Sequence, residues 1–246
     1  MRKFIISIAS SIRVLRVVVC MSLFAILVGC TDQAPRRGGD ILVLGDSVMA
    51  WNSASNASIP DAMGRVLGRN VVSKAVPGAQ FDNPSGIAGA IGFDIQRQLP
   101  PGRWNWVVIN GGANDLGSDC GCGACGPVVD GLIGADNTSG SIPAFIQKVR
   151  GVTGANVMWM GYYAGSGQGS FAGCRDDLIE LEVRLARFAA SQAAVSFADS
   201  EDVIDRNDRM LFAGDNTHPS AKGSALIGAY LAQHIRSREP RIESKR

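Results

Sequence analysis

The sequence predicts an α/β fold: a three-layer α/β/α domain on a mostly parallel, doubly wound (flavodoxin-like) sheet of about five strands. Two observations predict it. From Asp40 onward, short apolar runs alternate with amphipathic stretches, which is typical of a parallel sheet with helices on both faces. No internal repeat or low-complexity block interrupts the chain, so we expect one domain over residues 40–236 and a polar tail at 237–246.

Each predicted strand is a short apolar or β-branched run that is bounded by Gly, Pro or Asn. The runs cover residues 41–44, 71–76, 106–110, 157–161 and 195–198. Such near-continuous apolar runs fit strands that are covered by helices on both faces of a sheet.

The predicted helices lie between and after these runs, at residues 59–67, 87–99, 142–152, 176–194 and 220–236. The fourth contains an apolar stripe with i, i+3, i+4 spacing, formed by Leu178, Leu181, Leu185 and Phe188. Arg184 and Arg187 lie off this stripe, so we expect one face of the helix to be buried and the other to face solvent.

The composition excludes several classes of protein. With 246 residues, 46% of them hydrophobic and 19% charged, the chain is too apolar for a disordered protein. Six cysteines are too few for a small disulfide-scaffolded protein of this length. Lys and Arg number 24 against 22 Asp and Glu, and no dense basic stripe accompanies them, so no nucleic-acid partner is predicted.

The N-terminus has the pattern of an export signal. Four basic residues come first, namely Arg2, Lys3, Arg13 and Arg16, and an uncharged, mostly apolar run over residues 17–29 follows them. These thirteen residues are fewer than the roughly 20 that a membrane-spanning helix needs, but they match the apolar region of a secretory signal peptide.

The end of this run, Leu27-Val28-Gly29-Cys30, resembles the lipobox of bacterial lipoproteins. The resemblance implies that residues 1–29 are a signal peptide removed before Cys30, and that Cys30 then carries the lipid. Residues 30–39 would be a tether that holds the domain at a membrane of the cell envelope, facing the periplasm. Thr31, where the family's inner-membrane signal has Asp, favours the outer membrane. An ordinary signal peptide and an uncleaved anchor are the alternatives.

Cleavage before Cys30 would change the net charge of the protein. It would remove four basic and no acidic groups, so that 20 basic residues would stand against 22 acidic ones, a net charge of −2 instead of +2. The slight basicity of the full chain therefore belongs to the export signal.

Polar blocks follow the predicted strands, where ligands bind in sheets of this kind. Ser47 follows the first strand, Gly78 the second and Asn114 the third. A Ser at a strand-to-helix turn is a good position for a nucleophile, and a Gly there permits positive φ and close approach of a ligand. Each block also has a plainer interpretation: a helix cap, a turn, or a Gly/Asn loop.

His218 is the candidate catalytic base. The chain has two histidines, and His234 lies in a helical pattern near the C-terminus, where we expect a surface residue. Asp215 precedes His218 by three residues, close enough to bond one ring nitrogen while the other faces a nucleophile. Such a carboxylate fixes the tautomer of the imidazole and stabilises the imidazolium.

Together these blocks resemble the SGNH/GDSL hydrolase family. They come in family order and span residues 45–219, and they are Gly45-Asp46-Ser47, Gly78, Gly112-Ala113-Asn114-Asp115 and Asp215-Asn216-Thr217-His218-Pro219. One position departs from the pattern, because Val48 stands where the family usually has Leu.

The resemblance implies a serine esterase that hydrolyses acyl esters, O-acetyl esters among them, through an acyl-serine intermediate on Ser47. His218 would be the base and Asp215 would orient it. The oxyanion hole would consist of the N–H groups of Ser47 and Gly78 and the side-chain amide of Asn114, with no metal and no cofactor. The alternatives are a lipase, lysophospholipase, thioesterase or acyltransferase on the same scaffold, and a non-enzymatic binding module of the envelope.

The remaining cysteines are Cys120, Cys122, Cys125 and Cys174. In an oxidising periplasm, an even number of cysteines favours two disulfides. A Cys₄ zinc site and free thiols are the alternatives. All three pairings stay open, although a bridge between the cluster and Cys174 is sensible, since both follow neighbouring strands.

Two Gly-rich segments are expected to be loops. Residues 117–140 are a candidate rim or lid of the substrate site. Residues 165–169 lack the Lys-Ser/Thr ending of a phosphate-binding loop, so a flexible loop is predicted. The aromatic residues Tyr162, Tyr163 and Phe171 beside it either line a pocket or pack in the core.

Overall fold

The computed structural model describes residues 40–239. The predicted signal peptide, the lipidation site Cys30, the tether and tail residues 240–246 lie outside the described residues. Within residues 40–239, no helix is both long enough and apolar enough to span a bilayer.

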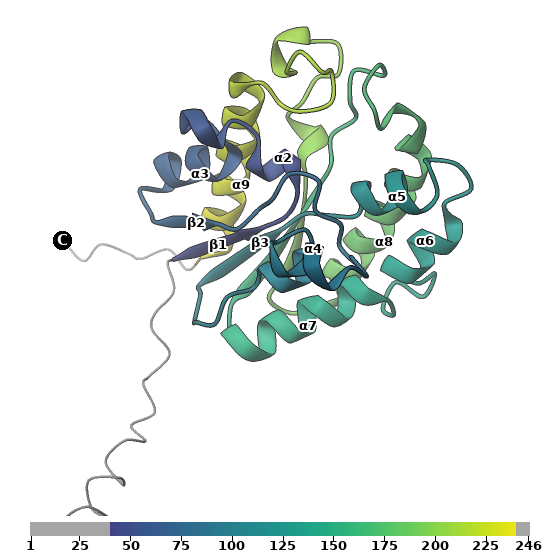
Figure 1. The fold of residues 1–246 in the computed structure, drawn as a ribbon. Helices are drawn as coiled ribbons and strands as arrows, with labels where there is room; N and C mark the ends of the chain where they lie inside the picture. The colour runs from purple at the N-terminus through teal and green to yellow at the C-terminus, as the bar shows by residue number, and fades with distance from the viewer. Residues whose placement is uncertain (1–39, 240–246) are drawn as a thin grey trace, which may run out of the picture. The chain divides into compact units, whose positions relative to one another are not determined.

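The sheet of the described domain has five parallel strands in the order β2-β1-β3-β4-β5 (Figure 1). They are β1 Ile41–Leu44, β2 Val71–Ser73, β3 Trp106–Ile109, β4 Asn156–Gly161 and β5 Val195–Asp199. The chain moves from β1 outward to β2 and then returns to β3 on the other side of β1. In a doubly wound sheet, this switch of direction opens a crevice beyond the carboxyl ends of the two strands between which it occurs, here β1 and β3. The predicted fold class is confirmed.

Helices cover both faces of the sheet, and each face has its own apolar core. Ile41 and Val43 of β1 contribute to the core shared with α3 and α9, whereas Leu42 and Leu44 contribute to the core shared with α7 and α8. This division follows from the alternation of side chains along a strand. The helices are α2 Ser47–Ala50, α3 Ile59–Leu67, α4 Gly86–Ala90, α5 Ala113–Asp119, α6 Gly126–Leu132, α7 Ser141–Thr153, α8 Arg175–Ser191 and α9 Ala221–Arg238. Short 3₁₀ segments lie at Ser53–Ser55, Ile95–Gln98, Ala172–Cys174, Ser200–Asp202 and Arg209–Leu211.

Helix α3 begins and ends where its local sequence dictates. Ser58 and Asp61 form a capping box at its start, and Gly68 ends it in the left-handed conformation, with φ of 66°. Helix α9 packs against it very closely, because a Cβ atom at Gly228 would lie 2.5 Å from the Cβ of Ala62. This pair of helices covers one face of the sheet, and helix α2 lies beside it (Figure 1).

The prediction of a single helix over residues 87–99 is wrong. The structure has helix α4 and then a separate 3₁₀ segment, Ile95–Gln98. Gly92 between them has φ of 94°, a left-handed conformation that ends a helix. Asp94 starts the second segment by accepting a 2.9 Å hydrogen bond from the N–H of Gln96.

The loop predicted over residues 117–140 is also partly wrong, because it contains the end of α5 and all of α6. Helix α6 has a Pro in its first turn, where the missing N–H costs nothing, and it buries Val129 and Leu132 in the core. The low helix propensity of its glycines is therefore overridden by packing.

Candidate active site

Ser47 is the first residue of α2, directly beyond the carboxyl end of β1. The preceding residue, Asp46, caps this helix by accepting a 2.9 Å hydrogen bond from the N–H of Val48. Because the first N–H groups of a helix have no partner within the helix, the N–H of Ser47 remains available to a ligand. The local sequence thus places a hydroxyl and a free N–H at the same turn.

Asp46 is almost completely buried, with 1% of its surface exposed, and its carboxylate joins two neighbouring strands to this turn. Oδ1 accepts a hydrogen bond from the amide of Asn110 (3.1 Å), and Oδ2 accepts one from the Tyr162 hydroxyl (2.5 Å). Burial raises the pKa of Asp46, and the hydrogen bonds from Tyr162, Val48 and Asn110 oppose that rise. Asp46 therefore holds the turn in place.

Gly45 allows this network to close. A Cβ atom at this position would lie 2.0 Å from Oδ1 of Asn110, so a larger residue would displace the amide. The buried side chain of Gln98 bonds both backbone groups of Gly45, accepting from its N–H at 2.8 Å and donating to its carbonyl at 2.9 Å. The glycine before the candidate nucleophile is thus required by close approach of its neighbours.

The structure brings Ser47, His218 and Asp215 into one hydrogen-bonded chain. Nε2 of His218 lies 2.7 Å from Oγ of Ser47, and Nδ1 lies 2.6 Å from Oδ2 of Asp215. Since a carboxylate can only accept, Nδ1 carries the proton that bonds Asp215, and Nε2 is free to accept the proton of Ser47. This is the tautomer that general-base catalysis requires.

The turn that carries His218 is organised by the same aspartate. Oδ1 of Asp215 accepts hydrogen bonds from the backbone N–H groups of Thr217 and His218, both at 3.0 Å. Burial alone would raise the pKa of Asp215, but the hydrogen bonds from His218 and Thr217 together lower it below its ordinary value. Tyr163 supports the turn from the neighbouring strand end, because its hydroxyl donates to the carbonyl of Thr217 at 2.8 Å.

Trp51 stacks on the imidazole of His218. The two ring centroids are 3.8 Å apart, and the ring planes differ by 5°. A flat aromatic face against the ring fixes its orientation, and such a face stabilises the positive charge that the ring carries while it holds the proton of Ser47. The sequence patterns did not indicate this contact.

The three candidate oxyanion donors differ in their surroundings. Gly78 lies in an exposed turn with φ of 79°, the positive φ that its position predicts. Asn114 is the second residue of α5, and its side-chain amide donates a 2.9 Å hydrogen bond to the carbonyl of Ala79, the residue after Gly78. This bond ties the second and third blocks together, and within residues 40–239 the second N–H of the amide has no hydrogen-bond partner.

A cavity of about 310 Å³ opens beside the hydroxyl of Ser47. Its lining combines Ser47, Asn114 and His218 with residues of the segment after β4, of α8 and of the segment after β5. The aromatic residues Tyr162, Tyr163 and Phe171 belong to this lining, as do Gly165, Gly167 and Gly169. None of residues 117–140 lines this cavity, so the structure does not support that segment as its rim.

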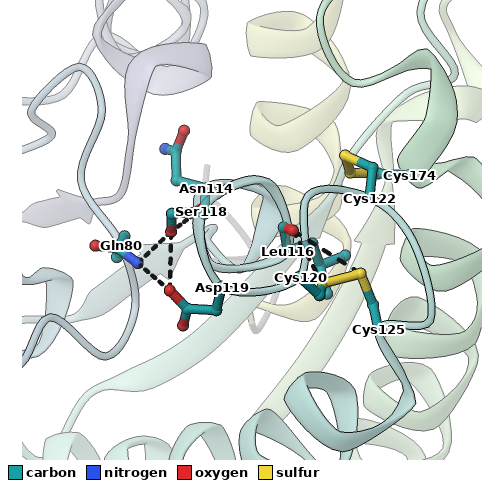
Figure 2. The surroundings of a disulfide bond; sticks show 9 residues. All are labelled: Gln80, Asn114, Leu116, Ser118, Asp119, Cys120, Cys122, Cys125 and Cys174. Carbon is teal, nitrogen blue, oxygen red and sulfur yellow. Dashed lines mark hydrogen bonds between the residues drawn. A yellow bond between two sulfur atoms is a disulfide. The ribbon is translucent and has the colours of Figure 1, made fainter.

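The cysteines form two pairs, Cys120–Cys125 and Cys122–Cys174 (Figure 2). The first closes a short loop within the cluster, and the second joins the cluster to the residue before α8. In Figure 2, Asn114 lies at one end of α5 and the disulfides lie at the other. Cysteines that are joined in disulfides have no thiolate to offer to a zinc ion. Within residues 40–239 no group of three or more His, Cys, Asp and Glu side chains is suited to hold a metal ion.

Comparison with protein families agrees with this geometry. The model of the GDSL-like lipase/acylhydrolase family matches residues 43–226, which is most of the chain. The chain belongs to this family. No curated protein sequence matches this GDSL-like chain.

Solved structures of similar fold include esterases. A carbohydrate acetylesterase from Sinorhizobium meliloti has 16% identity and a TM-score of 0.57, with 80% of this chain and 98% of that chain covered. The inhibitor-bound aryl esterase of M. smegmatis also has 16% identity and a TM-score of 0.57, with 80% of this chain and 98% of that chain covered. A protein proposed to be an SGNH hydrolase from Slackia heliotrinireducens has 23% identity and a TM-score of 0.54, with coverage of 79% and 97%. At these identities the likeness concerns the fold.

Several side chains of this GDSL-like site have no signal in the sequence patterns. Asn110 and Gln98 are buried polar residues at the ends of a strand run and of a helical segment, and only their contacts with the Ser47 turn reveal their role. Glu182 lines the cavity from α8, next to the apolar stripe that the spacing predicts. Tyr162, Tyr163 and Phe171, for which the sequence left pocket and core open, line the cavity.

Proposed function

We propose that this GDSL-like protein is a serine esterase that hydrolyses acyl esters, O-acetyl esters among them. The observation that carries the proposal is the hydrogen-bonded chain from Oγ of Ser47 through the imidazole of His218 to Asp215. Two neighbours of similar fold are named as a carbohydrate acetylesterase and an aryl esterase, and these names support an ester substrate.

In the first half of the reaction, Oγ of Ser47 attacks the ester carbonyl while Nε2 of His218 takes its proton. Asp215 stabilises the imidazolium that results. The N–H groups of Ser47 and Gly78 and the free amide N–H of Asn114 stabilise the oxyanion, and one such donor contributes roughly 3 kcal/mol in comparable enzymes. The intermediate collapses, the alcohol leaves with the proton from His218, and the acyl group remains on Ser47.

In the second half, a water molecule gives its proton to His218 and attacks the acyl-serine. The same donors stabilise the second oxyanion, and collapse returns the proton to Oγ of Ser47 and releases the acid. Both halves use the same base and the same donors, so one set of groups from four segments of the chain serves the whole cycle.

We also propose that the enzyme acts at the bacterial cell envelope, anchored by a lipid on Cys30. The basic leader, the apolar run and the Leu-Val-Gly-Cys sequence support this placement. Metabolic labelling with radioactive palmitate tests it: the wild-type protein should take up label, and Cys30→Ser should not. Equal labelling of the two proteins would contradict the anchor.

The nucleophile is tested with p-nitrophenyl acetate. We expect Ser47→Ala to lose turnover and to lose labelling by a fluorophosphonate probe while its circular dichroism stays unchanged. Ser53→Ala is the matched control, because Ser53 is an exposed serine near the same turn, and it should keep both properties. Full activity in Ser47→Ala would overturn the assignment.

A further inference from the structure

Four charged side chains line the α8 side of the cavity, and the ester chemistry proposed above uses none of them. Arg175 and Glu182 come from α8, and Glu201 and Arg206 come from the segment after β5. Only Glu182 of the four is buried, and a buried charged group is costly unless it is paired or meets a complementary ligand. Their pairing therefore tells what the cavity is suited to bind.

Glu182 is buried, with 8% of its surface exposed, and it still lines the cavity. Oε1 accepts a hydrogen bond from the N–H of Tyr162, and within residues 40–239 no partner bonds Oε2. A carboxyl group with one oxygen engaged and the other without a protein partner has a hydrogen-bonding position to offer at the cavity wall.

The charge state of Glu182 follows from its neighbours. Burial raises its pKa to about 8, the carboxylates of Asp199 and Glu201 add to the rise, and the N–H of Tyr162 and the guanidinium of Arg175 oppose it. At neutral pH this carboxyl group is therefore protonated, and Oε2 offers an O–H donor to the cavity.

The two arginines are not equivalent. Arg175 forms an ion pair with Glu201 at 3.1 Å. Arg206 is an exposed residue that lines the cavity beside the Gly-rich segment, where its Nη2 would be 3.3 Å from a Cβ atom at Gly167. No carboxylate of the described domain lies within ion-pair distance of it. With Glu182 neutral and Arg175 compensated, Arg206 leaves one positive charge at this side of the cavity.

The rest of this wall is apolar and aromatic, formed by Tyr163, Phe171, Leu178 and Ile179. The volume of about 310 Å³ is near the lower limit for small-molecule sites, so the cavity fits a compact group and not a long chain. A bare hydrocarbon chain would also cover the buried carboxyl group of Glu182 without giving its second oxygen a partner.

We propose that this side of the cavity is a subsite for a carboxylate on the substrate, so that the preferred substrates are esters of hydroxy acids or of acidic sugars. The guanidinium of Arg206 and the open carboxyl group of Glu182 donate to the substrate carboxylate, and the aromatic wall packs against its body. The proposal rests on the esterase function proposed above and names the class of ester that the same site prefers.

The test compares two esters of equal size, 4-acetoxybenzoate and 4-acetoxybenzamide, which differ in charge. For each enzyme, kcat/KM for the benzoate is divided by kcat/KM for the benzamide, and the result is divided by the same ratio of their hydroxide-catalysed rates. This corrected ratio depends neither on the intrinsic reactivity of the esters nor on the amount of active enzyme. At pH 7 the wild-type ratio should favour the carboxylate by about tenfold, the usual effect of one charge-assisted hydrogen bond.

Arg206→Gln should bring this ratio close to one, whereas Arg209→Gln should leave it unchanged, since Arg209 is an exposed arginine that does not line the cavity. The ratio of the wild-type enzyme should fall between pH 7 and 9, because Glu182 ionises there and repels the substrate carboxylate. In Glu182→Gln the amide still donates and cannot ionise, so its ratio should stay constant with pH.

A wild-type ratio near one, or a high ratio that Arg206→Gln does not lower, would overturn the subsite. If neither ester is hydrolysed, the esterase proposal fails and the subsite is tested by calorimetry with 4-hydroxybenzoate and 4-hydroxybenzamide. Preferential binding of the acid that Arg206→Gln removes would then support it, and equal binding would overturn it.

Discussion

The backbone N–H of Trp51 donates a 2.8 Å hydrogen bond to the carbonyl oxygen of Ser47, which places the two residues one helical turn apart. The ring of Trp51 lies on the imidazole of His218, and Oγ of Ser47 meets Nε2 of the same imidazole. One turn of α2 therefore holds both the candidate nucleophile and the aromatic surface that orients its base.

Replacing Trp51 tests this arrangement. We expect Trp51→Ala to lower kcat for p-nitrophenyl acetate by about tenfold, because the imidazolium loses a cation–π partner and the ring gains freedom. KM should change little, since Trp51 does not line the cavity. Trp51→Phe keeps an aromatic face and should retain most of the activity. An alanine variant with wild-type kcat would show that the stacking has no catalytic consequence.

Replacing Asp215 by Asn should lower kcat by roughly 10⁴-fold, as expected when the wrong imidazole tautomer is stabilised. Oδ1 of Asp215 accepts two backbone N–H groups, so the amide oxygen of the variant takes that place and its NH₂ group faces Nδ1 of His218. The proton then moves to Nε2, where it blocks the approach of the Ser47 proton. Asp205→Asn, at an exposed aspartate that also caps a turn, is the control and should keep full activity.

The two disulfides should contribute unequally to stability. They span 52 residues in Cys122–Cys174 and five in Cys120–Cys125. The chain-entropy model gives about 4 kcal/mol for the longer loop and about 2 kcal/mol for the shorter one. Double replacement of each pair by Ser, followed by urea unfolding, compares them fairly, because each pair contains one fully buried sulfur, at Cys174 or Cys125. A larger loss of unfolding free energy from the Cys120–Cys125 pair would contradict this order.

Glu182 should make the domain less stable as the pH rises. Its pKa is about 8 in the folded chain and 4.5 ordinarily, so between these pH values the folded chain holds a proton that the unfolded chain has released. Stability then falls with pH, by at most about 1.4 kcal/mol per pH unit for one proton. In urea titrations from pH 5 to 8, Glu182→Gln should become steadily more stable relative to the wild type. Glu180→Gln, on the exposed side of the same helix, should follow the wild-type slope.

The parts of the fold that were predicted from sequence are those with strong local signals. Strand β1 and helix α3 have the predicted bounds, because an apolar run and a capping box define them without reference to other elements. The break at Gly92 and the helix at Gly126–Leu132 were missed for the opposite reason. A glycine shows whether it ends a helix or continues one only when its backbone conformation and the packing around it are known.

The residues of the candidate site also fall into two groups, those that the local sequence identifies and those that only the packing reveals. Ser47, Asp215 and His218 could be identified because each lies beside a turn at a strand end or helix start, where parallel sheets gather their functional residues. Trp51 and Glu182 could not, since their contacts depend on where the turn before α9 and the helix α8 lie in space. In the sequence, Glu182 is one polar residue of an amphipathic helix, and Trp51 lies outside the predicted helices and strands.

The separation of Ser47 and His218 by 171 residues has a consequence for how the enzyme comes into being. The nucleophile belongs to the first part of the domain to leave the ribosome, and its base belongs to nearly the last. A growing chain therefore holds an inert serine until the final helix can pack against α3. The onset of ester hydrolysis during refolding would then mark the completion of the entire domain, not the formation of any local part of it.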